Sequence, residues 1–215
     1  MELGAIQVSF EKAEKFRTHK SAATLQSIIN ATIQCFIEIG YFRTTTTEIA
    51  KRANLTRGAV QYYFPTTADV LRASITSLLE EWLDTYYSAL RGISSDEDQL
   101  SKSIDVYWEF VRCPLFVAWQ ELVAASRTDP ELAEIVDSAA VSYEEKRTEE
   151  GRKIYPQHMC SAGDNFDLGR DLSRVVLEGL TLTQLTYDRK EREAAIVDVL
   201  KDTVRRLWNL DTPKS

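Results

Sequence analysis

The sequence predicts an all-α protein. Apolar side chains recur at the three- and four-residue spacing of helices over most of the 215 residues. Only eight Gly and five Pro are present, so long stretches contain no residue that interrupts a helix. No segment of useful length shows the strict alternation of apolar and polar residues that is typical of a strand. We therefore expect a helical N-terminal unit followed by a larger helical region.

The N-terminal unit is predicted to hold three helices. Apolar residues between Leu25 and Ile37 recur at helical spacing, and Gly40 is suited to end that helix. Thr45 and Glu48 have the spacing of a capping box, and Thr56 is the next N-cap candidate. The predicted helices are 24–39, Thr45 to about Ala53, and Thr56 to Tyr62 or Tyr63, with Asn54 and Leu55 in the turn.

The rest of the chain is predicted to form longer helices. A Pro at the first helical position marks one start at Asp129-Pro130-Glu131, and Pro114 separates two others. The predicted helices are Thr67–Tyr86, Leu100–Val111, Leu115–Ala125, Pro130–Tyr155, 167–188 and 191–210, with connections at 92–99 and 156–165.

Composition favours a cytoplasmic protein. Cys35, Cys113 and Cys160 are widely spaced and form no CxxC pair, which indicates reduced thiols and neither a disulfide framework nor a zinc site. No apolar run approaches the roughly 18 residues of a membrane span. The first 20 residues lack the apolar core of a signal peptide. We expect no membrane partner and no cofactor.

The net charge of −7 is unevenly distributed. Residues 15–72 carry eight Lys/Arg against three acids, a local charge of +5, whereas the remaining residues are acidic. Positive charge is therefore concentrated in the region that contains the three predicted N-terminal helices, as the neutralisation of DNA phosphates requires.

Two short capped helices within this basic region predict a helix-turn-helix, in which the second helix enters the DNA major groove. Ile49 and Ala50 can brace the first helix, while Val60 and Phe64 anchor the second. Arg can bind guanine and Gln can bind adenine, each through two hydrogen bonds. The predicted DNA-binding residues are Thr45, Thr46, Thr56, Arg57, Gly58, Gln61, Tyr62 and Tyr63.

These residues resemble a known family. Gly40-Tyr41, Thr44-Thr45, Glu48-Ile49-Ala50, Leu55 to Val60 and Tyr62-Tyr63-Phe64-Pro65 are similar to the N-terminal domain of TetR-family transcriptional regulators. The resemblance covers about residues 24–71. The chain departs from the family pattern at Asn54, where Gly is usual, at Gln61, where Tyr is common, and at Thr66-Thr67-Ala68, where Ser-Lys-Glu is common.

The resemblance implies a homodimer that binds a double-stranded DNA operator and a small-molecule effector. The implied division is an arm over 1–20, a DNA-binding domain over 21–66 and a ligand-binding and dimerisation domain over 67–215. Apolar faces of the last two helices would form the dimer interface, as is common for four-helix contacts. Its predicted residues are Leu172, Val176, Leu180, Thr183, Ile196, Leu200, Val204 and Leu207.

Aromatic residues in the middle of the chain indicate where an effector could bind, because apolar pockets with a few polar groups suit hydrophobic or aromatic ligands. Aromatic residues at helical spacing also commonly form ordinary core. The predicted ligand-binding residues are Trp82, Tyr86, Tyr107, Trp108, Phe116, Trp119, Gln120 and Tyr143.

An enzyme is not expected. His19 and His158 are the only histidines, and neither has neighbours that suggest a metal site or a catalytic triad. The expected function is a ligand-responsive transcriptional regulator, a repressor released from its operator by the effector. Two alternatives remain open: an activator of the same fold, and a helical protein-interaction module that does not bind DNA.

Overall fold

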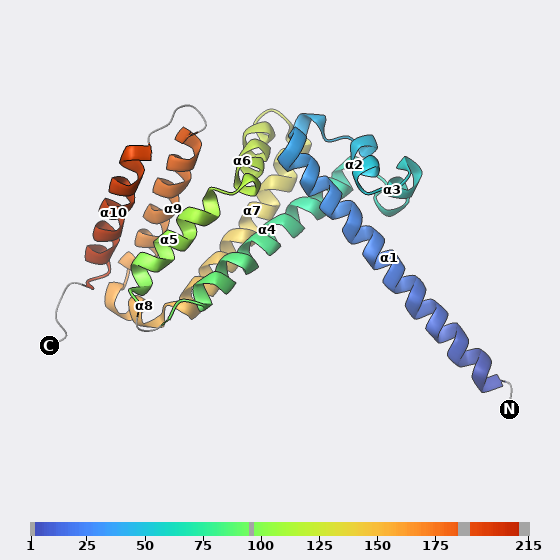
Figure 1. The fold of residues 1–215 in the computed structure, drawn as a ribbon, viewed down its shortest axis with the longest axis horizontal. Coiled ribbons are helices and arrows are strands. Elements are labelled where there is room, and N and C mark those ends of the chain that lie inside the picture. Colours follow the sequence, from blue (N-terminus) through green and yellow to red (C-terminus); the bar gives the residue numbers. More distant parts are fainter. Residues whose placement is uncertain (1–2, 95–96, 185–189, 211–215) are drawn as a thin grey trace. The chain divides into compact units, whose positions relative to one another are not determined.

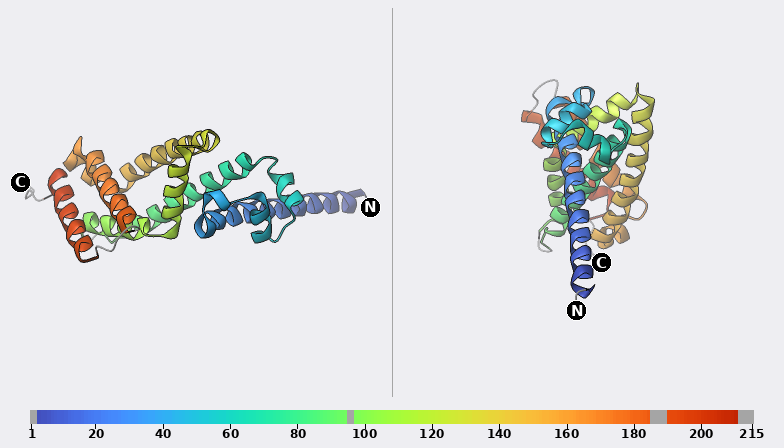
Figure 2. Two further views of the ribbon diagram at one scale, coloured as in Figure 1. Left: turned by 90° about the horizontal axis from the view of Figure 1, so that it is seen from above. Right: turned by 90° about the vertical axis from the view of Figure 1, so that its right-hand side faces the viewer.

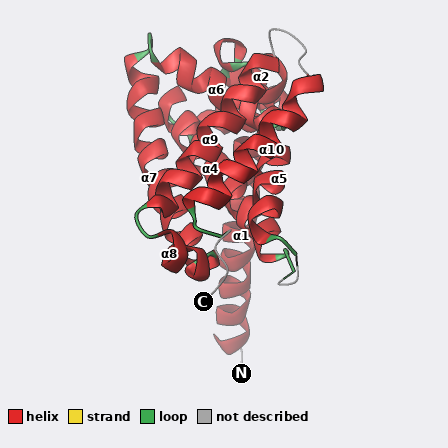
Figure 3. Ribbon diagram, turned by 90° about the vertical axis from the view of Figure 1, so that its left-hand side faces the viewer, coloured by secondary structure: helices red, strands yellow, loops and turns green. Residues whose placement is uncertain are grey.

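The described part of the protein is helical. A computed structural model describes residues 3–94, 97–184 and 190–210, and no strand occurs in these ranges (Figures 1 and 3). The predicted all-α class is confirmed. The elements are α1 (Leu3–Ile39), η1 (Tyr41–Arg43), α2 (Thr46–Arg52), α3 (Arg57–Tyr63), α4 (Thr67–Arg91), α5 (Gln99–Val111), α6 (Pro114–Ser126), α7 (Pro130–Ile154), α8 (Pro156–Ala162), α9 (Asn165–Gln184) and α10 (Lys190–Leu207).

The chain divides into two compact units. The N-terminal unit comprises Met1–Leu78 and Glu121–Val136, and the C-terminal unit comprises Leu79–Gln120 and Asp137–Ser215. The helix α4 continues without interruption past Leu78, so this one helix carries residues of both units.

The core of the N-terminal unit contains residues from α1 to α4. Ile28, Ile49 and Ile75 are fully buried, and Phe36 and Val60 are nearly so. Burying such side chains is the main favourable contribution to folding, at about 1.5–3 kcal/mol each. The short helices α2 and α3 are thus held by their buried residues, because isolated helices of this length are not stable in water.

The junction between α1 and η1 is fixed by Glu121 of α6 and by Asp129, which directly precedes α7, in the same unit. The backbone N–H of Tyr41 donates to Oε1 of Glu121 over 2.8 Å, and the Tyr41 hydroxyl donates to Oδ2 of Asp129 over 2.7 Å. Gly40 has φ +79°, and a Cβ at this position would overlap the Glu121 carboxylate. The positive φ favours glycine here, and any side chain at this position would displace the Glu121 carboxylate.

The C-terminal unit contains two aromatic clusters. Trp82 of α4 stacks on Phe110 and Tyr143, with ring centroids 5.1 and 5.8 Å apart. Trp208, directly after α10, stacks on Phe166 of α9 at 5.1 Å and on His158 of α8 at 5.3 Å. The helices α9 and α10 pack side by side, as Figures 1 and 2 show.

The structure corrects several predicted boundaries. α1 begins at Leu3 and not near residue 24, because residues 5–20 contain no Gly or Pro and are rich in Ala, Glu and Lys, which favour helix without an apolar pattern. Residues 156–162, predicted as a loop, form α8, where Pro156 is at the first helical position and suits its geometry. The predicted end of α9 at residue 188 lies outside the described residues.

Candidate functional site

The turn between α2 and α3 has a defined conformation. Asn54 has φ +54°, and the backbone N–H of Leu55 donates to the Ala50 carbonyl over 2.9 Å. A positive φ favours glycine, but asparagine tolerates it better than other side chains do. This explains how the chain keeps the turn with Asn where the resemblance led us to expect Gly.

Both short helices begin with a threonine cap. Oγ1 of Thr45 accepts from the backbone N–H of Glu48 over 3.3 Å, and Oγ1 of Thr56 accepts from Ala59 over 3.1 Å. Both predicted caps are confirmed. The Glu48 carboxylate accepts from Arg52, which also binds Glu38 of α1 and so links α2 to α1. These contacts fix the orientation of the helix that precedes α3.

The α3 surface presents most of the predicted DNA-binding residues to solvent. Val60 is buried beneath α3, whereas Tyr62 is 82% exposed. Tyr62 and Tyr63 are in edge-to-face contact, with ring centroids 5.3 Å apart. Thr45, Thr56, Arg57, Gly58, Gln61 and Tyr62 are exposed, and Thr46 and Tyr63 are half-buried. A helix with its first turn exposed in this way can place Arg57 and Gln61 against base edges in a major groove.

The unusual Thr66-Thr67-Ala68 segment forms the cap of α4. Oδ2 of Asp69 accepts from the backbone N–H of Thr66 over 3.0 Å, and Oγ1 of Thr66 accepts from the backbone N–H of Asp69 over 3.1 Å. The hydrogen bonds from Thr66 lower the pKa of Asp69. The reciprocal pair is a capping box with Asp in place of Glu, so the departure from the family pattern retains the start of α4.

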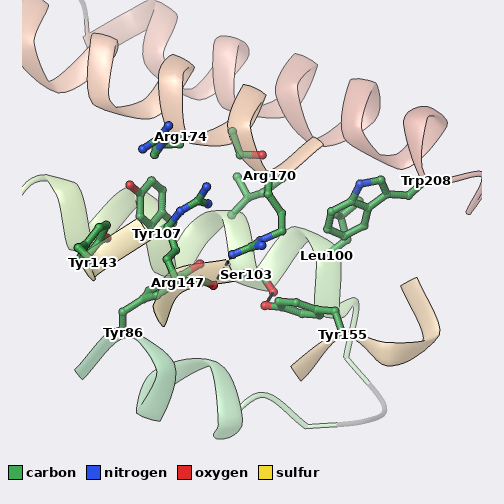
Figure 4. A pocket seen from close by; sticks show the side chains of 12 residues that line it. Tyr86, Leu100, Ser103, Tyr107, Tyr143, Arg147, Tyr155, Arg170, Arg174 and Trp208 are labelled. Carbon is green, nitrogen blue, oxygen red and sulfur yellow. Dashed lines mark hydrogen bonds between the residues drawn. The ribbon is translucent and has the colours of Figure 1, made fainter. Parts of the chain in front are cut away.

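The C-terminal unit contains a cavity of about 60 Å³, which we call the tyrosine–arginine cavity. Tyr86, Tyr107 and Tyr143 of the predicted ligand-binding set line it. The cavity is also lined by Leu100, Ser103, Ile104, Arg147, Tyr155, Arg170, Ser173, Arg174 and Trp208 (Figure 4). Aromatic walls with a few convergent polar groups are typical of small-molecule sites.

The other predicted ligand-binding residues do not line this cavity. Trp82 and Phe116 are buried against each other, with ring centroids 5.7 Å apart. The guanidinium of Arg112 lies over the Trp108 ring at 5.2 Å, and Trp119 and Gln120 are half-buried. Their contribution to ligand binding stays a prediction.

Sequence reasoning did not identify the arginines of the cavity. Nη2 of Arg147 binds Glu144 and Asp171, the latter at 2.8 Å, and Nη2 of Arg170 donates to the Arg147 carbonyl over 2.7 Å. A signal was present at Gly151, a glycine inside an otherwise charged helix, where a Cβ would overlap the Arg170 guanidinium. A helix-interior glycine costs about 1 kcal/mol relative to alanine and so indicates close packing.

The cavity tyrosines and Arg147 keep their ordinary charge at neutral pH, because their pKa values are raised. Burial raises the pKa of Tyr155 to about 12, and it raises the pKa of Tyr86 and Tyr107 well above the usual value. Burial disfavours the charged form of Arg147, but hydrogen bonds and charges of Glu144 and Asp171 raise its pKa overall. The tyrosines are therefore neutral hydrogen-bond donors beside charged guanidinium groups.

The outer faces of α9 and α10 carry exposed apolar side chains. Leu168, Val175 and Leu182 are 54, 66 and 38% exposed and recur every seven residues, so they lie on one face of α9. Val199 of α10 is similarly exposed. Of the predicted dimerisation residues, Leu200 and Val204 are buried within the protomer and Thr183 is exposed, while Leu172, Val176, Leu180, Ile196 and Leu207 are half-buried. A seven-residue repeat was visible in the sequence and would have identified the exposed set.

No helix in the described ranges is both long enough and apolar enough to cross a membrane.

Comparisons with known proteins agree with the geometry of the N-terminal unit. Residues 28–74 match the family of bacterial regulatory proteins described as the tetR family. An uncharacterized HTH-type transcriptional regulator of Mycobacterium tuberculosis is 27% identical over 177 residues, which cover 82% of this chain and 90% of the relative.

Solved structures share the fold. A TetR-family transcription regulator from Marinobacter aquaeolei has a TM-score of 0.56 at 14% identity, covering 89% of this chain and 97% of that one. The regulator FadR from Bacillus subtilis, solved in complex with stearoyl-CoA, has a TM-score of 0.57 at 17% identity, covering 85% and 96%. The capped α2–turn–α3 thus lies in a segment that matches the tetR family of bacterial regulatory proteins, and most of the chain is similar to HTH-type transcriptional regulators.

Proposed function

We propose that this regulator is a homodimeric repressor that a small molecule releases from its operator. The observation that carries the proposal is the tyrosine–arginine cavity, which places aromatic walls and polar groups within one unit of the protein. The neighbouring structure of FadR from Bacillus subtilis contains stearoyl-CoA, so a protein of this fold binds a small molecule.

The two DNA-reading helices of a dimer must lie about one helical turn of DNA apart, roughly 34–36 Å. The exposed apolar residues of α9 and α10 support a dimer, because apolar side chains that gather on an exposed face commonly mark a protein–protein interface. A symmetric contact through this face would use the same residues on both protomers.

The helix α4 is the proposed connection between ligand and DNA. Tyr86 of α4 lines the cavity, and the same uninterrupted helix begins at Thr67, just after α3. A ligand changes operator affinity only if it binds two states of the protein with different affinities. We propose that the bound ligand displaces α4 and thereby alters the separation of the two recognition helices.

A gel shift with DNA from upstream of the regulator's own gene tests the proposal. We expect specific binding that weakens steeply between about 50 and 200 mM salt, because several phosphates are neutralised. Compounds that raise the melting temperature of the protein are then added to the bound complex. Release of the DNA by such compounds is the expected result.

Two variants locate the response. Ser103→Trp places a large side chain in the cavity and should retain DNA binding while it abolishes release. Ser138→Trp adds the same side chain at an exposed position of α7 and should behave like the wild type. Equal operator affinity of ligand-saturated and ligand-free protein would falsify the proposed response.

A further inference from the structure

The charges around the tyrosine–arginine cavity are arranged asymmetrically. Among the described residues, three guanidinium groups line the cavity, those of Arg147, Arg170 and Arg174, and no carboxylate does. The carboxylates that pair with them are about half exposed: Glu144 is 43%, Asp171 is 49% and Asp167 is 48% exposed. The cavity lining therefore presents cations to a ligand, while the carboxylates paired with them are half exposed; one further carboxylate, that of Glu178, accepts from the hydroxyl of the cavity-lining Tyr107 over 2.7 Å.

Arg170 has the weakest ionic compensation of these cations. Its side chain is only 11% exposed, and its ion pair with Asp167 is long, at 3.4 Å. Its shorter hydrogen bond, from Nη2, is to the neutral carbonyl of Arg147. In addition, Nε of Arg174 is buried and has no hydrogen-bond partner among the described residues. Buried cationic donors that lack acceptors are unfavourable, and an anionic ligand would satisfy them.

The fold holds Arg170 in place by packing. Figure 4 shows Arg170 reaching from α9 towards Ser103 and the backbone of Arg147. The guanidinium lies against α7 at Gly151, the position where a Cβ would overlap it. Its Nη2 donates to the Arg147 carbonyl and, over 3.5 Å, to the Tyr87 hydroxyl, and its Nη1 has only the long contact with Asp167. The remaining N–H groups, on Nε and Nη1, are the donors that a carboxylate could use.

The size of the cavity limits the ligand. A water molecule needs about 10–15 Å³ of such volume, so 60 Å³ corresponds to roughly four to six waters. That is less than half of the roughly 150 Å³ of an engineered cavity that binds benzene, so an aromatic ring would need the tyrosine walls to move apart or would extend out of the cavity. Tyr86, Tyr107 and Tyr143 supply the flat walls that an aromatic ring would contact.

We propose that the effector is a small aromatic monocarboxylate of about the size of benzoate, with its carboxylate bound by Arg170. Arg147 and Arg174 add to the positive potential, and the tyrosine rings enclose the aromatic group. This inference rests on the proposed function insofar as the cavity is taken as the effector site.

Benzoate and its neutral isostere benzamide form a matched pair of probes. Binding to the full-length protein is measured by ligand-observed NMR and titration calorimetry, without DNA. We expect benzoate to bind at least about tenfold more tightly than benzamide, because only the carboxylate pairs with a guanidinium. Arg170→Met should remove this preference and leave benzamide binding unchanged.

Two further variants separate charge from position. Gly151→Ala keeps every arginine but displaces the Arg170 guanidinium, so it should weaken benzoate binding severalfold. Arg152→Met removes an exposed arginine of the same helix that does not line the cavity, and it should leave the preference intact. If Arg170→Met fails to fold, the preference for benzoate over benzamide is measured instead in Arg170→Lys, which keeps the charge.

The outcomes distinguish the two proposals. Equal binding of benzoate and benzamide, binding of neither, or an unchanged preference in folded Arg170→Met overturns the anionic effector. Selective benzoate binding with no change in operator affinity supports the anionic site and overturns the ligand-responsive repressor. Release of DNA by a neutral compound that binds equally to Arg170→Met supports the repressor and overturns the anionic effector.

Discussion

At the scale of single residues, the N-terminal unit separates residues that hold α3 from residues that α3 presents. Val60 is buried, whereas Arg57 and Gln61 are exposed on the same helix. Changing Arg57 or Gln61 should therefore alter DNA recognition without altering the fold, whereas changing Val60 would alter both.

We predict that Arg57→Ala and Gln61→Ala each weaken operator binding by ~1–3 kcal/mol and relax the choice of base, because each removes hydrogen bonds to base edges. Fluorescence anisotropy with operator and mutated operators measures this. Lys51→Ala, at an exposed position of α2, is a charge-matched control that should affect all sequences alike. Unchanged base selectivity in both α3 variants would show that α3 is not the reading helix.

His158 gives the protein a predicted pH dependence. Burial lowers the pKa of His158 from its usual 6.5, with Asp98 raising it and Arg205 lowering it. Because the folded-state pKa is depressed, the unfolded chain takes up the proton first as the pH falls. The free energy of unfolding should therefore decrease from about pH 7.5 downwards, until the pH passes the folded-state pKa. His158→Phe keeps a ring against Trp208 and should flatten this slope in urea unfolding; the same slope in both proteins would assign it to other groups.

At the scale of elements, short helices and turns depend on particular backbone conformations. The α2–α3 turn needs a positive φ at Asn54, and the packing of α9 on α10 needs a residue without a side chain at Gly169, where a Cβ would overlap Trp208. Each requirement concerns a single backbone position. The local sequence suggested the requirement at Asn54 but not the one at Gly169.

We predict that Asn54→Gly leaves stability unchanged or slightly increased, whereas Asn54→Ala destabilises the protein by about 1 kcal/mol. A Cβ without a polar group is unfavourable in the left-handed region, and glycine has no such penalty. Thermal melting of both variants measures the difference. Equal melting temperatures of the two variants would mean that the turn relaxes to another conformation.

We predict that Gly169→Ala destabilises the C-terminal unit by ~1–3 kcal/mol, because the added methyl group forces Trp208 and Val204 to move. Gly179→Ala, on the same helix with open space around it, is the control and should be neutral or stabilising by up to about 1 kcal/mol. Urea unfolding followed by tryptophan fluorescence compares the two. A neutral Gly169→Ala would contradict the close packing of α9 against Trp208.

At the scale of the whole molecule, the proposed operator recognition and ligand response both depend on assembly into a dimer. One recognition helix contacts only half of a symmetric operator, so a dimer interface contributes to DNA affinity even where it lies far from DNA. The exposed residues of α9 and α10 are the surface that can provide this interface.

We predict that Val175→Glu converts a dimer into a monomer, because it places a charge in the middle of the exposed apolar face of α9. Light scattering after size-exclusion chromatography measures the mass. Val141→Glu changes a similarly exposed valine on α7, 60% exposed, and should leave the dimer intact. A dimeric Val175→Glu protein would place the interface elsewhere.

The sequence alone determined much of the N-terminal unit, because its signals are local. A cap such as Thr45 or Thr56 acts on backbone groups three residues away, so the printed sequence already contains both partners. Periodic apolar residues likewise determined the all-α class and most helix boundaries. Local composition did not reveal α8 clearly, since its stability depends on His158 stacking on a tryptophan 50 positions later.

Only the tertiary structure decided which aromatic residues form core and which line a cavity. Trp82 and Tyr86 belong to one helix and have the same helical pattern, yet Trp82 is stacked in the core whereas Tyr86 lines the cavity. The arginines that give this cavity its charge come from α7 and α9, and they meet because Gly151 allows a side chain from α9 to lie against α7. Such a site depends on contacts between residues distant in the chain, which no local pattern encodes.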